Sequence, residues 1–184
     1  MLRAMPTRGP ETPNSGAHWS RCPGCDLRLP DANGEVDPRK GSSAACRMLY
    51  GEVEGYELSH VARLGHRHQL LVDTYGAQHV GRETPAIRAA FCLIGLRLVL
   101  VDGWSGVAVR DAHQELARRF RTWPTFDPPA QRASLTVFDL ALATSPDDYE
   151  LILARWAEAV WSTWEPAHGR VHNLIKQRMW SAPA

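Results

Sequence analysis

The chain carries almost no net charge and very little lysine. Its 20 acidic residues nearly balance its 21 basic residues, so the molecule as a whole does not attract nucleic acid or an anionic membrane surface. Only Lys40 and Lys176 are lysines, a bias that fits genomic composition better than recognition of a ligand. Nucleic acid is therefore not an expected partner.

No apolar run is long enough to cross a membrane. The most apolar stretch, from Ala89 to Val101, contains Arg97 and is too short for the roughly 30 Å of a bilayer's hydrocarbon. Residues 1–20 lack the apolar core of a signal peptide and are rich in Pro, Gly, Ser and Thr, which predicts a disordered leader. We therefore expect a cytoplasmic protein without a membrane segment.

Convincing strand pairs are also missing, and apolar residues recur instead at helical spacing. Ser145 and Pro146, followed by two aspartates, predict the start of the best-marked helix, because these residue types favour a helix N-terminus. The sequence thus predicts an all-α bundle of five to six helices over residues 48–180. This bundle forms one domain with a zinc-knuckle-like loop at residues 21–47.

Cysteine is scarce, with four residues in the chain, and a complete pair of zinc knuckles is absent. Cys22 and Cys25 form a "CPGC" turn that can supply two thiolates to one ion, and Cys46 follows after twenty intervening residues. Leu49 stands where the second knuckle would have its other cysteine. In a reducing cytoplasm, this pattern in a loop with few apolar residues favours a metal site over disulfides.

A histidine on the helices after the loop is expected to supply the fourth ligand. Cys92 is the remaining thiol, but it lies among apolar residues and is expected in the core. We predict zinc bound by Cys22, Cys25, Cys46 and His68, with His79 as the alternative fourth ligand. The two histidines are about 16 Å apart along a straight helix, so they cannot bind the same ion. Redox or iron–sulfur chemistry and a loop without metal remain alternatives.

Polar ring residues on the same helix suggest a catalytic cluster as a second hypothesis. Two histidines and a tyrosine fall near one helix face, and an aspartate could orient a histidine of an adjacent helix. The candidate catalytic residues are His68, Asp73, Tyr75, His79 and His168. The alternative is that these residues are buried and join helices through hydrogen bonds.

The pair His168 and His172 has the spacing of two ligands on one helix face. With His68 or His79, the pair could bind a second metal ion that keeps positions open for water. Peptidase chemistry is not expected, because Gly169 follows His168 where a zinc protease motif has glutamate. Histidines near a helix end can also simply interact with the helix dipole.

Tryptophans gather late in the chain, at positions 156, 161 and 164. At helical spacing in an apolar stripe, they are expected to anchor the core or an interface. An exposed patch around them would bind a protein partner or form a homodimer. The enzymatic alternative would be a metal-dependent hydrolase or transferase acting on a small molecule, and the sequence leaves open whether the protein is an enzyme.

These blocks resemble an uncharacterised bacterial family known as a domain of unknown function. The resemblance runs from Cys22 to Ile175 and depends on "CPGC", "AACRMLYGEV", "HQLLVDTYGAQHVG", "LIGLRLVL" and "WAEAVWSTWEPAH". It implies that nine residues are characteristic of the family, without giving them roles: Cys22, Cys25, Cys46, His68, Asp73, Tyr75, Gln78, His79 and His168. Val80 stands where the family often has proline. The chain is also faintly similar, at the level of fold, to the DinB and YfiT-like metal-binding helical bundles.

Overall fold

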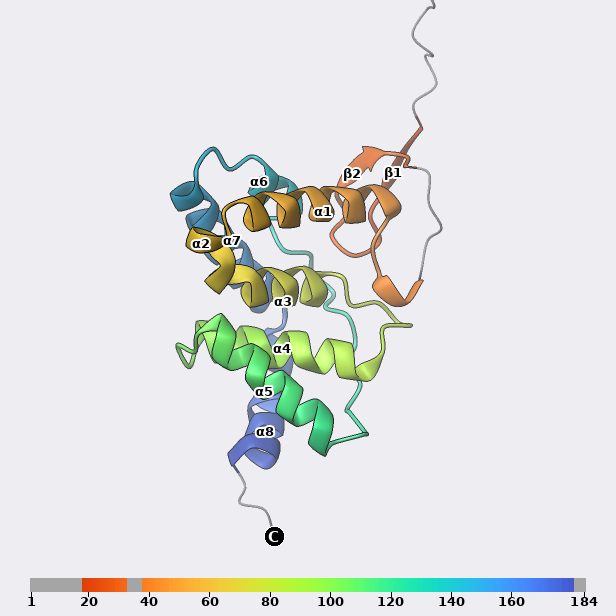
Figure 1. The fold of residues 1–184 in the computed structure, drawn as a ribbon. Coiled ribbons are helices and arrows are strands. Elements are labelled where there is room, and N and C mark those ends of the chain that lie inside the picture. Colours follow the sequence, from red (N-terminus) through yellow and green to blue (C-terminus); the bar gives the residue numbers. More distant parts are fainter. Residues whose placement is uncertain (1–17, 33–37, 181–184) are drawn as a thin grey trace, which may run out of the picture.

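The structure is a computed structural model that describes residues 18–32 and 38–180. Helices dominate it, which confirms the predicted all-α class (Figure 1). The longer helices are α1 Ala44–Ser59, α3 His68–Gln78, α4 Ala86–Leu100, α5 Gly106–Arg119, α7 Pro146–Thr163 and α8 His168–Ile175. The shorter elements are α2 Val61–Leu64, α6 Val137–Ala141, the 3-10 turns Pro38–Lys40, Gly65–Arg67 and Glu165–Ala167, and the π-helical turn Lys176–Trp180. No helix in the described part of the chain is both long and apolar enough to span a membrane.

Side-chain caps fix where several helices begin. The Ser145 hydroxyl accepts a hydrogen bond from the Asp148 N–H at 3.2 Å, and Pro146 occupies the first helical position, as the sequence predicts. Ser43 caps α1 in the same way by accepting from the Cys46 N–H at 3.2 Å. The α1 cap therefore fixes the backbone of one of the cysteines.

Helix α3 lies in the middle of the bundle, between α1 and α4 (Figure 1). It packs against α4, α5 and α7, and nearly every residue from Leu70 to Gln78 is buried. The Trp156 indole N–H donates to the Gln78 side-chain oxygen at 3.1 Å, which ties α7 to the end of α3. Trp156, Trp161 and Trp164 are all buried, so they anchor the core and do not form the exposed patch that partner binding through them requires.

The expectation that the chain has no strand pair is wrong. Strands β1 Trp19–Arg21 and β2 Arg28–Pro30 pair antiparallel, with Trp19 opposite Pro30 and Arg21 opposite Arg28. Each strand has only three residues, which is too short for an alternating pattern to be recognised. The strands flank the "CPGC" turn, so the loop is a β-hairpin whose tip carries the first two cysteines.

Two of the predicted segments lie partly outside the described residues. Residues 1–17 of the expected leader and residues 33–37 of the cysteine loop lie outside the described residues. Trp19 and Ser20, expected in the leader, belong to β1. Helix α3 ends at Gln78, and His79 follows it as the helix C-cap.

Candidate metal centre

Four side chains from three distant segments meet at one point. The potential ligand atoms of Cys22, Cys25, Cys46 and His79 all lie within 4.8 Å of one another. The hairpin tip supplies the first two, the first turn of α1 supplies Cys46, and the C-terminus of α3 supplies His79. None of the four residues is more than 4% exposed. This group could hold a metal ion away from water.

The orientation of His79 leaves one ring nitrogen free for the thiols. Its Nδ1–H donates to the Tyr75 carbonyl at 2.7 Å, so Nε2 carries the lone pair. Nε2 lies 3.4 Å from the Cys46 sulfur. The Tyr75 ring packs on the imidazole with centroids 4.1 Å apart and holds the ring plane in place. A backbone hydrogen bond at the other nitrogen is the usual support for a metal-binding histidine.

Two glycines let the N-terminal loop reach His79. A Cβ at Gly24 would lie 2.4 Å from the His79 Cδ2 atom, and a Cβ at Gly41 would lie 1.9 Å from the His79 carbonyl oxygen. Gly41 also has a φ of +62°, a backbone conformation that other residues rarely adopt. Larger residues at either position would therefore push the loop away from His79.

The thiols also influence one another's protonation. Hydrogen bonds from Cys25 and Cys46 lower the pKa of Cys22. The Ser43 N–H lies 3.5 Å from the Cys22 sulfur, and the Tyr75 hydroxyl lies 3.6 Å from the Cys46 sulfur. The hydrogen bonds with Cys22 have the opposite effect on the other two thiols. They raise the pKa of Cys25 to about 12 and raise the pKa of Cys46 further. Three thiolates can coexist here only beside a cation, which would displace the protons.

The donor set decides what such an ion could do. Three thiolates and one imidazole form one of the four-coordinate sets typical of structural zinc, with no position left for water or substrate. A catalytic zinc has three protein ligands and an open position. The closed, buried arrangement therefore fits a structural ion better than a catalytic one.

His68, the expected fourth ligand, does not lie at this cluster. Its Nδ1–H donates to a carboxylate oxygen of Glu57 at 2.8 Å. His68 begins α3 and His79 follows its last residue, so about 16 Å of helix separates the two positions. Only the C-terminal end of α3 meets the first turn of α1, which is why the alternative ligand His79 joins the cysteines.

The other catalytic candidates are also separate from one another. Tyr75 lies beside the cluster, but Asp73 is buried among α3, α4 and α5, where burial raises its pKa well above the usual range. The Nε2–H of His168 donates to the Trp161 carbonyl at 3.1 Å, and its ring stacks on the indole with centroids 3.8 Å apart. The candidates therefore do not form one catalytic constellation.

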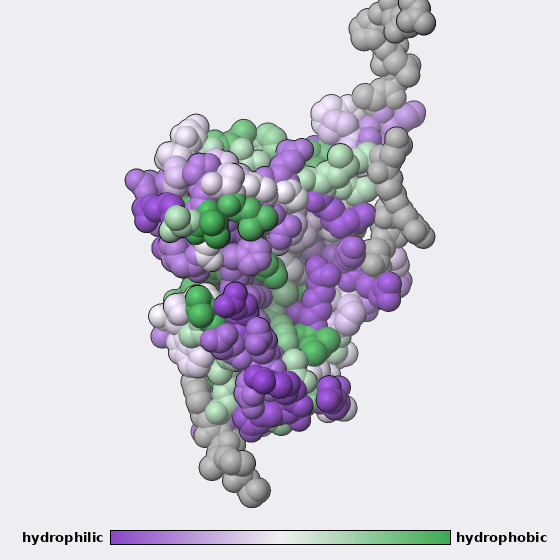
Figure 2. Space-filling model, viewed as in Figure 1, coloured by the Kyte–Doolittle hydropathy of each residue, from purple (hydrophilic) through white to green (hydrophobic). Residues whose placement is uncertain are grey.

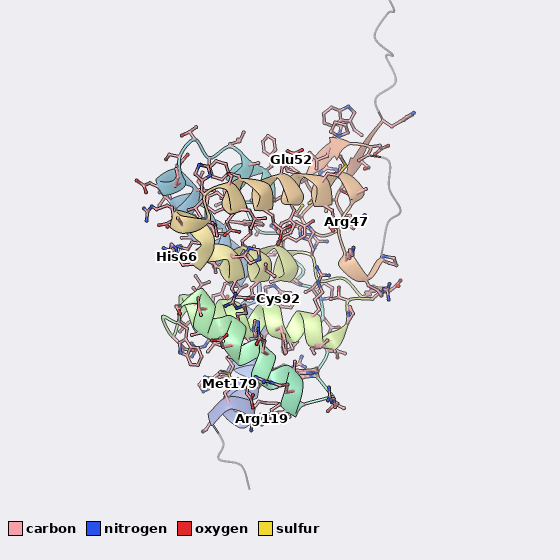
Figure 3. All side chains as sticks on the ribbon, viewed as in Figure 1. Arg47, Glu52, His66, Cys92, Arg119 and Met179 are labelled. Atoms are coloured by element: carbon pink, nitrogen blue, oxygen red, sulfur yellow. The ribbon has the colours of Figure 1, made fainter. Side chains whose placement is uncertain are left out.

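A second metal site is not formed by the described residues. His172 lies on the exposed side of α8, and within residues 18–32 and 38–180 only the group with His79 brings together three or more potential ligands. Cys92 lies between α3 and α4, where it is buried against Gly76 and burial raises the pKa of its thiol (Figure 3). It is a core residue, as expected.

Several supporting residues could not be identified from the sequence. Gly24 lies inside the quoted "CPGC" turn, but nothing in that motif indicates that the glycine faces His79. Glu57, the buried partner of His68, follows the exposed Glu52 and the half-buried Glu54 on α1, and its spacing gives no sign of its burial. The single glycine of the "KGSS" segment before α1 is the only sequence signal for the close approach at Gly41.

Comparison with known proteins assigns the chain to a family. The profile described as "Family of unknown function (DUF5946)" matches residues 20–165, and the chain belongs to this family. No curated protein and no solved structure matches it, so the similarity to DinB and YfiT-like bundles has no support. The matched region contains all four residues of the metal-binding group.

Proposed function

We propose that the protein binds one zinc ion through Cys22, Cys25, Cys46 and His79, and that this ion fastens the N-terminal hairpin to the helical bundle. The observation that carries the proposal is the convergence of four buried ligand atoms from three segments. Zinc fits this donor set because it accepts thiolates and imidazole together in a closed tetrahedron. An iron–sulfur cluster usually takes cysteine ligands alone.

Apart from the cysteines, few contacts hold the hairpin on the bundle, one of them a hydrogen bond from the Arg132 guanidinium to the Pro23 carbonyl at 2.8 Å. Every residue of β1 is exposed, and among its apolar side chains only Leu27 and Leu29 pack partly against the core. Even full burial of such a side chain contributes only about 1.5–3 kcal/mol. Structural zinc sites contribute about 10–16 kcal/mol in small domains. The ion would therefore dominate the attachment of this segment.

The reducing environment that keeps thiols available for zinc is the cytoplasm, and we propose that location for the protein. A hydrolase or transferase that uses this ion is not supported, because a substrate would have to displace a protein ligand. The proposed role is structural, and the ion's contribution to function is the shape that it imposes on the hairpin and on the start of α1.

Metal analysis of purified variants tests the ligand set. We expect about one zinc per wild-type chain, and substoichiometric zinc after Cys46→Ser or His79→Ala. His68→Ala is the matched control, because it removes an imidazole from the same helix without touching the cluster. Zinc that is lost in His68→Ala and kept in His79→Ala, or a wild-type protein that binds no zinc, would overturn the proposal.

A further inference from the structure

An apolar groove runs along the outer side of α1. It has a volume of about 580 Å³, and its walls come from β2, α1 and α6. The α1 wall is formed by Ala45, Met48, Leu49 and Glu52, which follow helical spacing and so share one face. Figure 2 shows hydrophobic surface gathered at the top of the view, along α1 and α6.

Large apolar side chains in this groove are exposed to solvent. Met48 is 59% exposed and Phe138 is 43% exposed, although each lies among other apolar side chains. A smaller hollow of about 100 Å³ continues along the α1–α6 boundary, shares Glu52 and ends at Tyr149. Contiguous apolar surface of this kind marks an interaction site more often than scattered exposed residues do.

The charges at the groove all have one sign. Asp31 and Glu52 line it, and no lysine or arginine of the described residues does. The chain as a whole is nearly neutral, so this acidic rim is a local feature. It favours an occupant that places lysine or arginine beside apolar anchors.

We propose that this groove binds an amphipathic helix of a partner protein that carries apolar anchors flanked by basic residues. The α1 wall from Ala45 to Tyr56 is about 16 Å long at 1.5 Å per residue, which matches roughly three turns of a bound helix. A helix bound in such a groove uses apolar anchors at positions i, i+3, i+4 and i+7, which span about two turns. A second copy of this chain is a poorer occupant, because a two-fold contact would bring the two acidic rims together.

Binding of model peptides tests the proposal. The probes are a fluorescein-labelled 14-residue peptide, LKKLLKLLKKLLKL, and a matched peptide in which every lysine is glutamate. We expect saturable binding of the lysine peptide by fluorescence anisotropy, at least tenfold weaker binding of the glutamate peptide, and amide shifts in NMR spectra at Met48, Glu52 and Phe138.

Charge substitutions locate the bound peptide. Met48→Glu and Glu52→Lys should each weaken binding of the lysine peptide at least tenfold. The control Val101→Glu adds a charge at a residue that is 55% exposed and lies outside the groove, and it should leave the affinity unchanged. Equal binding of both peptides, equal binding by the Met48→Glu variant, or a wild-type dimer in sedimentation that Met48→Glu abolishes would each overturn the proposal.

Discussion

Replacing Gly41 with alanine should loosen the loop from the end of α3. Its φ of +62° costs a residue with a Cβ about 1–2 kcal/mol. The new Cβ would lie 1.9 Å from the His79 carbonyl oxygen, so the two backbones must separate by about 1 Å. Shifting packed backbone adds about 1–3 kcal/mol. The free energy of unfolding should therefore fall by about 2–5 kcal/mol.

Gly51 provides a matched control for this substitution. It lies exposed within α1, and a Cβ there would meet no atom within 4 Å. Alanine at this position should raise the free energy of unfolding by about 0.5–1 kcal/mol, because glycine is a poor helix former.

Thermal melts and zinc titrations measure both effects. For a chain of this size, about 2–4 °C of melting temperature corresponds to 1 kcal/mol, so Gly41→Ala should lower the melting temperature by at least about 4 °C. Its zinc affinity should also fall about tenfold or more, because the His79 backbone moves. If Gly41→Ala melts and binds zinc like the wild type, the loop does not pack against His79 as described.

Three further substitutions test the buried polar residues and the thiol outside the cluster. Burial raises the pKa of Asp73, so this carboxyl ionises less readily in the folded than in the unfolded chain, and stability falls as pH rises above about 4. Asp73→Asn should therefore gain stability relative to wild type as pH rises in urea unfolding, and a relative loss would contradict the burial of this carboxyl. The exposed control Asp111→Asn should change stability by no more than about 0.5 kcal/mol. His68→Ala leaves the buried Glu57 carboxylate without its donor and should cost about 1–3 kcal/mol by the same assay, and an unchanged stability would mean that the hydrogen bond is not formed. Cys92→Ala should keep one zinc per chain by metal analysis, and loss of zinc would make that thiol a ligand.

The sequence predicts local features of this fold better than distant contacts. Ser145 marks a helix start because capping depends on residues only three positions away. The "CPGC" turn and the spacing to Cys46 likewise indicate a metal site from local chemistry. The hairpin strands were missed because three residues carry no readable alternation, and their pairing depends on the turn between them.

The choice between His68 and His79 illustrates what the sequence could not decide. The sequence pattern places both histidines on one predicted helix near one face, so it gives no physical ground for the preference for His68 over His79. The decision depends on which end of α3 meets the first turn of α1, and that is a matter of tertiary packing. A buried acid at Glu57 also gives His68 a partner of its own, which the sequence does not indicate.

X-ray absorption at the zinc edge of the purified wild-type protein tests the central claim most directly. The proposed site predicts three sulfur ligands at about 2.3 Å and one nitrogen ligand at about 2.0–2.1 Å. The same measurement on His79→Ala should lose the nitrogen distance, while His68→Ala should leave the spectrum unchanged. A first shell with fewer than three sulfurs, or with bound water in the wild type, would contradict a closed structural site.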